Sequence, residues 1–308
     1  MKIQPYVRDV DRPPLAIKED GSWWQWRRHH TGIIGTTGSG KNSPITSMLY
    51  HDEPLIRQGL VAPYAFISPK DEDLMKLQYT TLVKEFATED PIDQAIVLGE
   101  VYNTMLKRIQ YNKWVASLTV AEKEQAQREG RLRTIVPKHL VIDEFNSEFE
   151  NLKTATIPNV LFRDVNKKTG EVEEKPATGE QIIKQILRKG RSPKVFLTIA
   201  SQGFNIEDIG KRENYQWWIF LRIMPSNKDW IDRAFGPGSL ESGIRPDLIP
   251  QLNPDGSTTA GVAFVKEDGG DHARVRFPYA SNAMFDKIVA RNRVEIPYSG
   301  PTDFSDLE

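Results

Sequence analysis

The stretch Ile33-Ile34-Gly35-Thr36-Thr37-Gly38-Ser39-Gly40-Lys41-Asn42-Ser43 joins an apolar, β-prone pair to a glycine-rich loop. Glycines let a backbone turn several N–H groups toward one oxyanion, and the start of a following helix adds the positive end of its dipole. A lysine that ends such a loop reaches the outer phosphates of a nucleotide. The stretch predicts a phosphate-binding loop whose contact residues are Gly35, Thr36, Thr37, Gly38, Ser39, Gly40, Lys41, Asn42 and Ser43.

The last position of this loop departs from the pattern G-x-x-x-x-G-K-[ST], because Asn42 stands where a hydroxyl is expected. That hydroxyl ordinarily gives a lone pair to Mg²⁺. Three interpretations are open: the amide oxygen of Asn42 replaces it, Ser43 takes its place, or the metal binds weakly and hydrolysis is slow. The alternative to a nucleotide site is a plain glycine-rich turn before a helix.

Composition limits the possible functions. The 308 residues are enough for one large α/β domain or two ordinary ones. The formal net charge of −1 offers no global attraction for nucleic acid, so any DNA contact must be local or built by several subunits. Cysteine is absent, which excludes disulfides and thiolate chemistry. The sequence has neither a membrane-length apolar run nor a signal core, and we expect a soluble cytoplasmic protein.

The hydrophobic pattern predicts an α/β fold with a mainly parallel central sheet and helices on both faces. Helical segments are expected over about 41–50, 99–131 and 182–191, with a further short apolar run at Ala95–Leu98. We expect an N-terminal arm or edge strands over 1–28, a main domain over 29–285 and a tail over 286–308. Residues 151–180 are expected to form a mobile insertion or hairpin. Strands are predicted near 31–35, 64–68, 139–142, 195–200 and 217–223, and a C-terminal hairpin at 261–265 and 273–277.

Two carboxylates follow one of the apolar strands, in the run His139-Leu140-Val141-Ile142-Asp143-Glu144. Ligands gather at the carboxyl ends of buried parallel strands. Asp143 is expected to hold Mg²⁺ together with Asn42 or Ser43, and Glu144 to polarise the attacking water. Acidic residues often stand at the ends of strands. The functional interpretation of this pair therefore depends on the phosphate-binding loop upstream.

Several segments, taken in order, resemble the FtsK/HerA-type hexameric DNA-translocating ATPases. Residues 34–41 look like the phosphate loop of that family, and residues 140–145 match its second nucleotide motif. Phe66–Lys70 is similar to a strand end that carries Asp-Pro-Lys in the family. Residues 188–202 align without gaps to its Arg-Ala-Ala-Gly segment, the following strand and its Ala-Thr-Gln sensor. The resemblance covers roughly residues 30–280.

The resemblance implies a RecA-like P-loop NTPase that uses ATP and Mg²⁺. It implies a ring of identical subunits, a hexamer in the family, that translocates double-stranded DNA. Lys41 and Glu144 would be catalytic, Gln202 would sense the γ-phosphate, and Arg191 would be an arginine finger supplied to the neighbouring subunit. Arg222 is a second candidate for the finger. For Arg191 the alternative is a cation that interacts with the C-terminus of a helix.

Some positions depart from the family pattern: Asn42, Ser68 in place of an acid, Ser201 in place of a threonine, and Gly203-Phe204 in place of Arg-Pro. Pore residues would lie at Lys70 and near Lys76 by analogy alone. Two other functions remain open. One is a viral or conjugative DNA-packaging or coupling ATPase, and the other is a nucleotide-binding assembly protein that hydrolyses ATP poorly.

Overall fold

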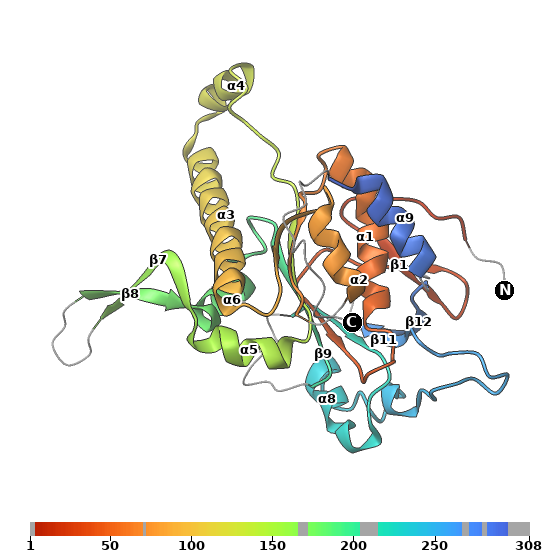
Figure 1. Cartoon of the computed structure of the whole chain (residues 1–308). Helices are drawn as coiled ribbons and strands as arrows, with labels where there is room; N and C mark the ends of the chain where they lie inside the picture. Colours follow the sequence, from red (N-terminus) through yellow and green to blue (C-terminus); the bar gives the residue numbers. More distant parts are fainter. Residues whose placement is uncertain are drawn as a thin grey trace, which may run out of the picture.

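The computed structural model describes residues 4–69, 72–165, 172–203, 215–266, 271–278 and 282–294. Within these ranges ten strands form one sheet in the order β2-β1-β12-β11-β10-β3-β9-β6-β4-β5. Figure 1 shows helices on both sides of this sheet, with α1, α2 and α9 on one side and α3, α5 and α6 on the other. The strands from β10 to β5 run parallel to one another. They are β3 (Thr31–Ile34), β4 (Tyr64–Ile67), β5 (Val83–Ala87), β6 (Lys138–Ile142), β9 (Val195–Ser201) and β10 (Trp217–Phe220).

The other end of the sheet is antiparallel. It begins at β10, which pairs antiparallel with β11, and it contains the predicted C-terminal hairpin. The N-terminal segment contributes two strands that complete this end of the sheet. The four strands are β1 (Pro14–Lys18), β2 (Trp23–Gln25), β11 (Val262–Lys266) and β12 (His272–Arg276).

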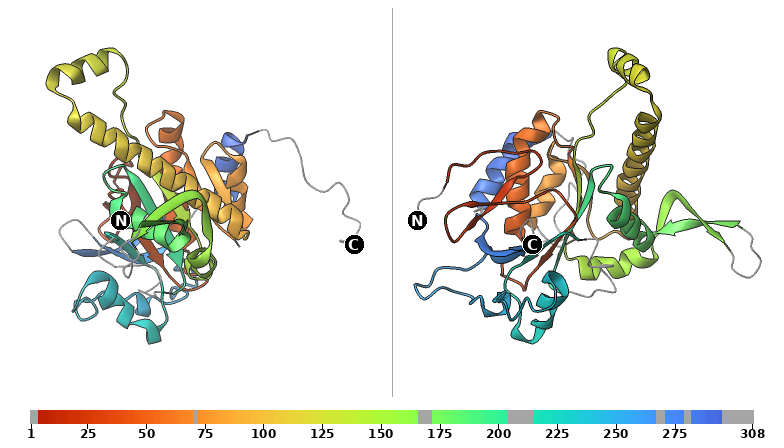
Figure 2. Two further views of the ribbon diagram at one scale, coloured as in Figure 1. Left: turned by 90° about the vertical axis from the view of Figure 1, so that its left-hand side faces the viewer. Right: turned by 180° about the vertical axis from the view of Figure 1, so that it is seen from behind.

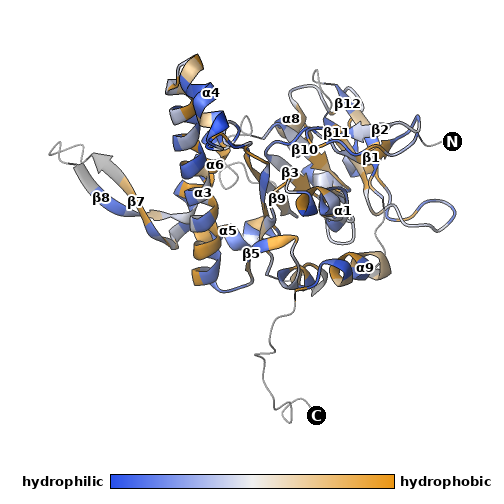
Figure 3. Cartoon of the chain, turned by 90° about the horizontal axis from the view of Figure 1, so that it is seen from above, coloured by the Kyte–Doolittle hydropathy of each residue, from blue (hydrophilic) through white to orange (hydrophobic). Residues whose placement is uncertain are grey.

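Successive side chains of each parallel strand point to opposite faces of the sheet, and in all of these strands except the edge strand β5 both faces are buried. Ile34 and Ile142 belong to one hydrophobic cluster, whereas Ile33 and Val141 belong to the other. This is why the strands inside the sheet are mainly apolar rather than alternating, and Figure 3 shows apolar residues around β3 and β9. The predicted sheet, with helices on both faces, is confirmed.

The helices divide between the two faces. One face is covered by α1 (Asn42–Arg57), α2 (Glu72–Met75), η1 (Lys76–Tyr79) and α9 (Asn282–Asn292). Hydrogen bonds from Arg291 and Asn292 to Glu53 fix α9 against α1, so part of the region expected as a tail is packed helix. The opposite face is covered by α3 (Pro91–Ser117), α5 (Phe145–Thr154) and α6 (Gly179–Lys189).

The helices differ from their predicted extent. The segment predicted as one helix over 99–131 is divided, because α3 ends at Ser117 and α4 begins at Val120. Residues Ala95–Leu98 are not a separate apolar segment, because α3 begins at Pro91. Asp90 caps this helix by accepting a hydrogen bond from the backbone N–H of Ile92, and proline suits the first helical position. Helix α1 continues to Arg57 with Pro54 inside it, beyond its expected end near residue 50.

Two parts of the chain extend away from the sheet (Figure 2). The far end of α3 continues into α4 (Val120–Arg128), and β7 (Thr156–Val165) pairs antiparallel with β8 (Val172–Thr178). This pair lies within the region 151–180. The remaining short elements are η3 (Pro225–Asn227), α8 (Asp229–Phe235) and η4 (Pro246–Leu248). None of the helices in the described part of the chain has both the length and the apolar character needed to cross a bilayer.

A buried ion pair fastens the N-terminal segment to the sheet. The Arg28 guanidinium donates to both carboxylate oxygens of Asp52 on α1, and both side chains are almost fully buried. The Tyr64 hydroxyl donates to the same carboxylate at 2.7 Å. Burial disfavours the charge on Asp52, yet the guanidinium beside it holds the pKa of this carboxyl below its usual value. Burial also lowers the pKa of nearby His139 to about 3, so its ring is neutral near pH 7.

We expect Asp52→Asn to destabilise the fold by about 3–5 kcal/mol, because it leaves a buried guanidinium without its counter-charge. Urea denaturation followed by circular dichroism measures the loss. The matched control is Asp286→Asn, which breaks an exposed ion pair of 2.9 Å with Lys76. That change should cost less than about 1 kcal/mol. Equal losses in the two variants would contradict this role of Asp52.

Candidate functional site

The predicted phosphate-binding loop connects the end of β3 to the start of α1. Gly38 and Gly40 have φ angles of +72° and +88°, a backbone conformation that suits glycine. A Cβ at Gly40 would also lie 2.6 Å from the backbone nitrogen of Gly261. The loop is therefore held in shape both by its own backbone and by close contact with the segment that leads into β11.

The strands on each side of β3 support this loop. The Gly35 N–H donates to the carbonyl of Ser201 at the end of β9, at 3.1 Å. The Thr36 N–H donates to the carbonyl of Arg222, just beyond β10, at 2.9 Å. The Gly261 N–H donates to the carbonyl of Ser39 at 3.0 Å. Because these bonds reach the loop from both sides, its backbone conformation is set before any ligand arrives.

Three of the predicted catalytic side chains meet beside the loop. Lys41 Nζ lies 3.8 Å from a carboxylate oxygen of Glu144. The Gln202 amide nitrogen donates to the two oxygens of that carboxylate at 3.0 and 3.2 Å. The Gln202 amide oxygen accepts a hydrogen bond of 2.9 Å from the Thr37 hydroxyl. Gln202 thus bridges the loop and Glu144.

Glu144 has an unusual backbone conformation for a residue with a side chain. Its φ and ψ are +47° and +42°, in the left-handed region, and it is the N-cap residue immediately before α5. This conformation costs about 1–3 kcal/mol outside glycine and is found mostly at functional sites. Here it turns the chain at the end of β6, and the Glu144 carboxylate lies between Lys41 and Gln202.

The predicted metal ligands lie on the same edge of the sheet. Asp143 is 4% exposed and follows β6, where its N–H donates to the carbonyl of Ile67. Ser43 is also buried, and its hydroxyl lies 3.4 Å from the position that a Cβ on Gly261 would take. Gly261 precedes β11, whereas Asp143 lies on the other side of β3 in the strand order. Ser43 therefore faces away from the Asp143 side of the loop, and Asn42 is the first residue of α1.

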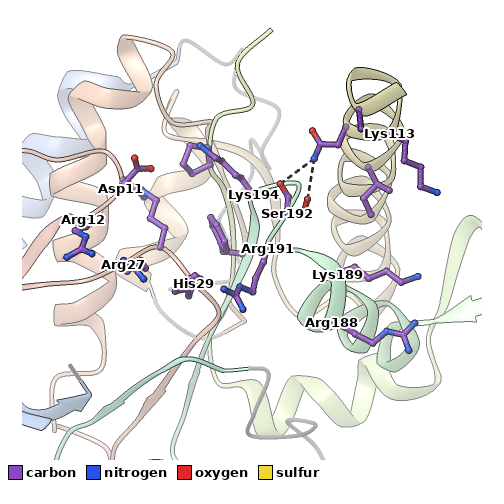
Figure 4. A pocket seen from close by; sticks show the side chains of 16 residues that line it. Asp11, Arg12, Arg27, His29, Lys113, Arg188, Lys189, Arg191, Ser192 and Lys194 are labelled. Carbon is purple, nitrogen blue, oxygen red and sulfur yellow. Dashed lines mark hydrogen bonds between the residues drawn. The ribbon is translucent and has the colours of Figure 1, made fainter. Parts of the chain in front are cut away.

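The two arginines predicted as candidate fingers lie at different places. Arg222 follows β10, and its guanidinium donates to the carbonyl of Thr37 in its own loop at 3.2 Å. Arg191 is exposed in the turn before β9, where it lines a cavity at the amino-terminal ends of the parallel strands (Figure 4). The seven residues of β9, about 23 Å of strand at 3.3 Å per residue, lie between the turn that carries Arg191 and Gln202.

Two supports of the loop are not evident from the sequence. Gly261 has no motif around it, although its contact with Gly40 shapes the loop. Arg222 is recognisable only as a charged residue that follows an apolar strand, and its contact with Thr37 depends on strand order. Of the two lysines suggested as pore residues, Lys76 pairs with Asp286 and Lys70 lies outside the described residues.

No protein-family model matches this sequence, and no curated protein sequence matches it. Solved structures do match. The ATPases 2 and 3 of EssC from Geobacillus thermodenitrificans superpose with a TM-score of 0.62 at 15% identity, over 94% of this chain and 49% of that one. The cytoplasmic domain of the type VII secretion ATPase EccC from Thermomonospora curvata gives a TM-score of 0.62 at 18% identity, over 96% and 32% of the two chains.

A third similar structure is the conjugation coupling protein TcpA of pCW3, determined as a monomer with ATPγS. Its TM-score is 0.57 at 15% identity, and the match covers 93% of this chain and 72% of that one. This chain spans about half of the matched EssC chain and a third of the EccC chain. At such identities the likeness establishes the architecture, and together with the loop geometry it shows that this chain has the α/β fold of P-loop NTPases.

Proposed function

We propose that this chain is an ATPase that assembles into a ring, hydrolyses ATP between neighbouring subunits and moves double-stranded DNA. The observation that carries the proposal is the bridge from Thr37 through Gln202 to Glu144, beside Lys41. This arrangement holds a carboxylate next to a loop that is shaped for phosphates. The DNA partner and the ring assembly are inferred from the sequence resemblance to FtsK/HerA-type motors.

The residues fit a nucleotide with its metal. Glycines at 38 and 40 let the loop curve around phosphates, and Lys41 is positioned at its end. In the described residues, no group of three or more His, Cys, Asp or Glu side chains gathers that could hold a metal alone. Mg²⁺ suits such a site, because it is commonly bound by one or two carboxylates together with substrate phosphates. Asp143 and Asn42 would hold it, and the ion would neutralise charge on the phosphates.

Each polar side chain then has a defined task. Lys41 would bind the outer phosphates, and Glu144 would accept a proton from the attacking water. Gln202 would sense the presence of the γ-phosphate, because its amide contacts both the loop and Glu144. Arg222 would stabilise the loop of its own subunit. Arg191 is too far from this site to act within one subunit and would act on the nucleotide of the neighbour.

We expect Lys41→Ala to abolish ATP binding and turnover, and Glu144→Gln to keep binding but reduce turnover at least about 100-fold. The two would differ because in this proposal Lys41 binds the phosphates, whereas Glu144 acts on the attacking water. DNA-stimulated phosphate release and binding of a fluorescent ATP analogue measure the two effects. Glu124→Gln, the same chemical change on exposed α4, is the control. Turnover that is unchanged in both site variants would refute the proposal, and turnover indifferent to DNA would refute its DNA-moving part.

We expect Asn42→Ala to raise the Mg²⁺ concentration for half-maximal turnover about tenfold, because an oxygen ligand is lost. Asn42→Thr should not raise it, since threonine restores the usual hydroxyl. Ser43→Ala is the matched control, because the Ser43 hydroxyl faces Gly261. A Mg²⁺ titration of phosphate release measures all three variants. If Ser43→Ala raises the required Mg²⁺ concentration instead, then Ser43 is the ligand. A large gain in turnover with Asn42→Thr would mean that asparagine slows hydrolysis.

We expect Arg191→Ala to reduce turnover about 1,000-fold while single subunits still bind ATP normally. Mixing this variant with Lys41→Ala should restore part of the turnover, because some interfaces then pair a native Arg191 with a native Lys41. Arg222→Ala provides the contrast, since it should weaken nucleotide binding within its own subunit. Loss of ATP binding in Arg191→Ala, or no recovery on mixing, would assign Arg191 a structural role at the end of α6.

A further inference from the structure

A cavity of about 1040 Å³ opens at the amino-terminal ends of the parallel strands, away from the phosphate-binding loop. Figure 4 shows that its walls come from α3, the end of α6 with the turn after it, and the N-terminal segment. Positively charged side chains dominate these walls. They include Lys113, Arg188, Lys189, Arg191 and Lys194, with Arg12 and Arg27 opposite, and we call this cavity the basic groove.

The basic groove concentrates charge in a chain whose net charge is −1. Asp11 is the one acidic side chain among the described residues that line it. Lys113, Lys189 and Arg191 are all exposed. Like charges held this close repel one another, and a surface of opposite charge would remove that cost. The lining also includes Ile109, Ala116, Pro137 and Phe196, so the groove suits a partner with both acidic and apolar side chains.

The walls of the groove are fixed to each other. The Arg108 guanidinium on α3 donates to the carbonyls of Pro193 and Lys194 at 3.0 and 3.1 Å. It also donates to the carbonyl of Val136, just before β6, at 2.9 Å. A single side chain therefore holds α3, the turn after α6 and the sheet together, and the groove is present before a partner binds.

A surface of complementary character lies at the other end of α3, which we call the acidic end of α3. Glu89 and Asp93 are exposed there. Ile92 and Ile96 are 67% and 46% exposed, although they are large apolar side chains. This surface follows the carboxyl end of β5, which is the edge of the sheet that carries the phosphate-binding loop.

The acidic end of α3 is also tied to the nucleotide site. The Gln94 amide nitrogen donates to the Glu148 carboxylate on α5, and Glu144 immediately precedes that helix as its N-cap. The acidic end and Glu144 are thus joined through one short helix. The basic groove, which includes Arg191, lies at the opposite edge of the sheet.

We propose that the basic groove receives the acidic end of α3 from a second copy of this chain. The proposal rests on the ring assembly proposed above and names the surfaces that form it. Lys113 and Lys189 would face Glu89 and Asp93, while Ile92 and Ile96 would enter the apolar part of the groove. Because the two surfaces lie at opposite edges of the sheet, the contact is head-to-tail, as a closed ring requires. It brings Arg191 to the edge that carries the nucleotide site of the neighbour.

Charge reversal tests the pairing. Lys113→Glu with Lys189→Glu should raise the concentration for half-maximal assembly at least about tenfold, and so should Glu89→Lys with Asp93→Lys. All four changes in one chain should restore assembly, because the charges are again opposite. Lys107→Glu with Lys123→Glu, outside the groove, is the matched control. Sedimentation velocity with a non-hydrolysable ATP analogue measures assembly, and circular dichroism confirms folding.

Cross-linking tests proximity without altering both surfaces. The chain has no cysteine, so Asp93→Cys and Lys113→Cys can be introduced as its only thiols. Twenty residues of helix place these two positions about 30 Å apart in one subunit, so a short bis-maleimide can join them only between subunits. We expect a ladder of covalent oligomers. The pair Asp93→Cys and Lys123→Cys, with its second thiol on α4, should give none.

The results separate this inference from the proposed function. If the native chain assembles but the charge-reversed variants assemble equally well, the docking surfaces are wrong and the ring stands. Equal cross-linking of the control pair, or no recovery in the fourfold variant, would also overturn the docking. If the native chain stays monomeric with nucleotide and DNA, both the ring and its docking fail. DNA-stimulated turnover by that monomer would leave the ATPase assignment in place.

Discussion

Parallel pairing of β3, β9 and β6 is the constraint on which the site depends. It brings the ends of three strands to one edge, where the loop, Gln202 and Glu144 follow them directly. Because β9 lies between β3 and β6, Gln202 can contact both the loop and Glu144. Catalytic groups fixed at the ends of buried strands need little reorganisation when a substrate binds.

The same pairing explains which features could be predicted from the sequence. The loop, Asp143 and Glu144 follow apolar strands, so local sequence was enough to indicate them, whereas Gln202 was indicated only by the family resemblance. Strand β5 was missed because its sequence, Val-Lys-Glu-Phe-Ala, carries charges typical of a sheet edge. The contacts of Gly261 and Arg222 with the loop were also missed. They depend on which strands are neighbours, and spacing along the chain does not encode that order.

Charge is distributed unevenly over this nearly neutral chain. Arg28 and Asp52 form a buried pair that links the N-terminal segment to α1. The exposed cations Lys113, Lys189 and Arg191 gather at one edge of the sheet, whereas Glu89 and Asp93 lie exposed at the start of α3. One helix, α3, carries an acidic first turn and reaches Lys113 near its other end, so it links the two edges of the sheet.

The contact between Gly40 and Gly261 restricts how this protein can evolve. Both residues have positive φ angles, and a Cβ at Gly40 would approach the Gly261 nitrogen to 2.6 Å. A larger residue at one position cannot be accommodated by a smaller one at the other, because each is already glycine. Second-site suppressors of a substitution here would have to move β11 as a whole. The nucleotide loop and the C-terminal hairpin are therefore expected to be inherited as one unit, and exchanging either alone between homologous chains should disrupt both.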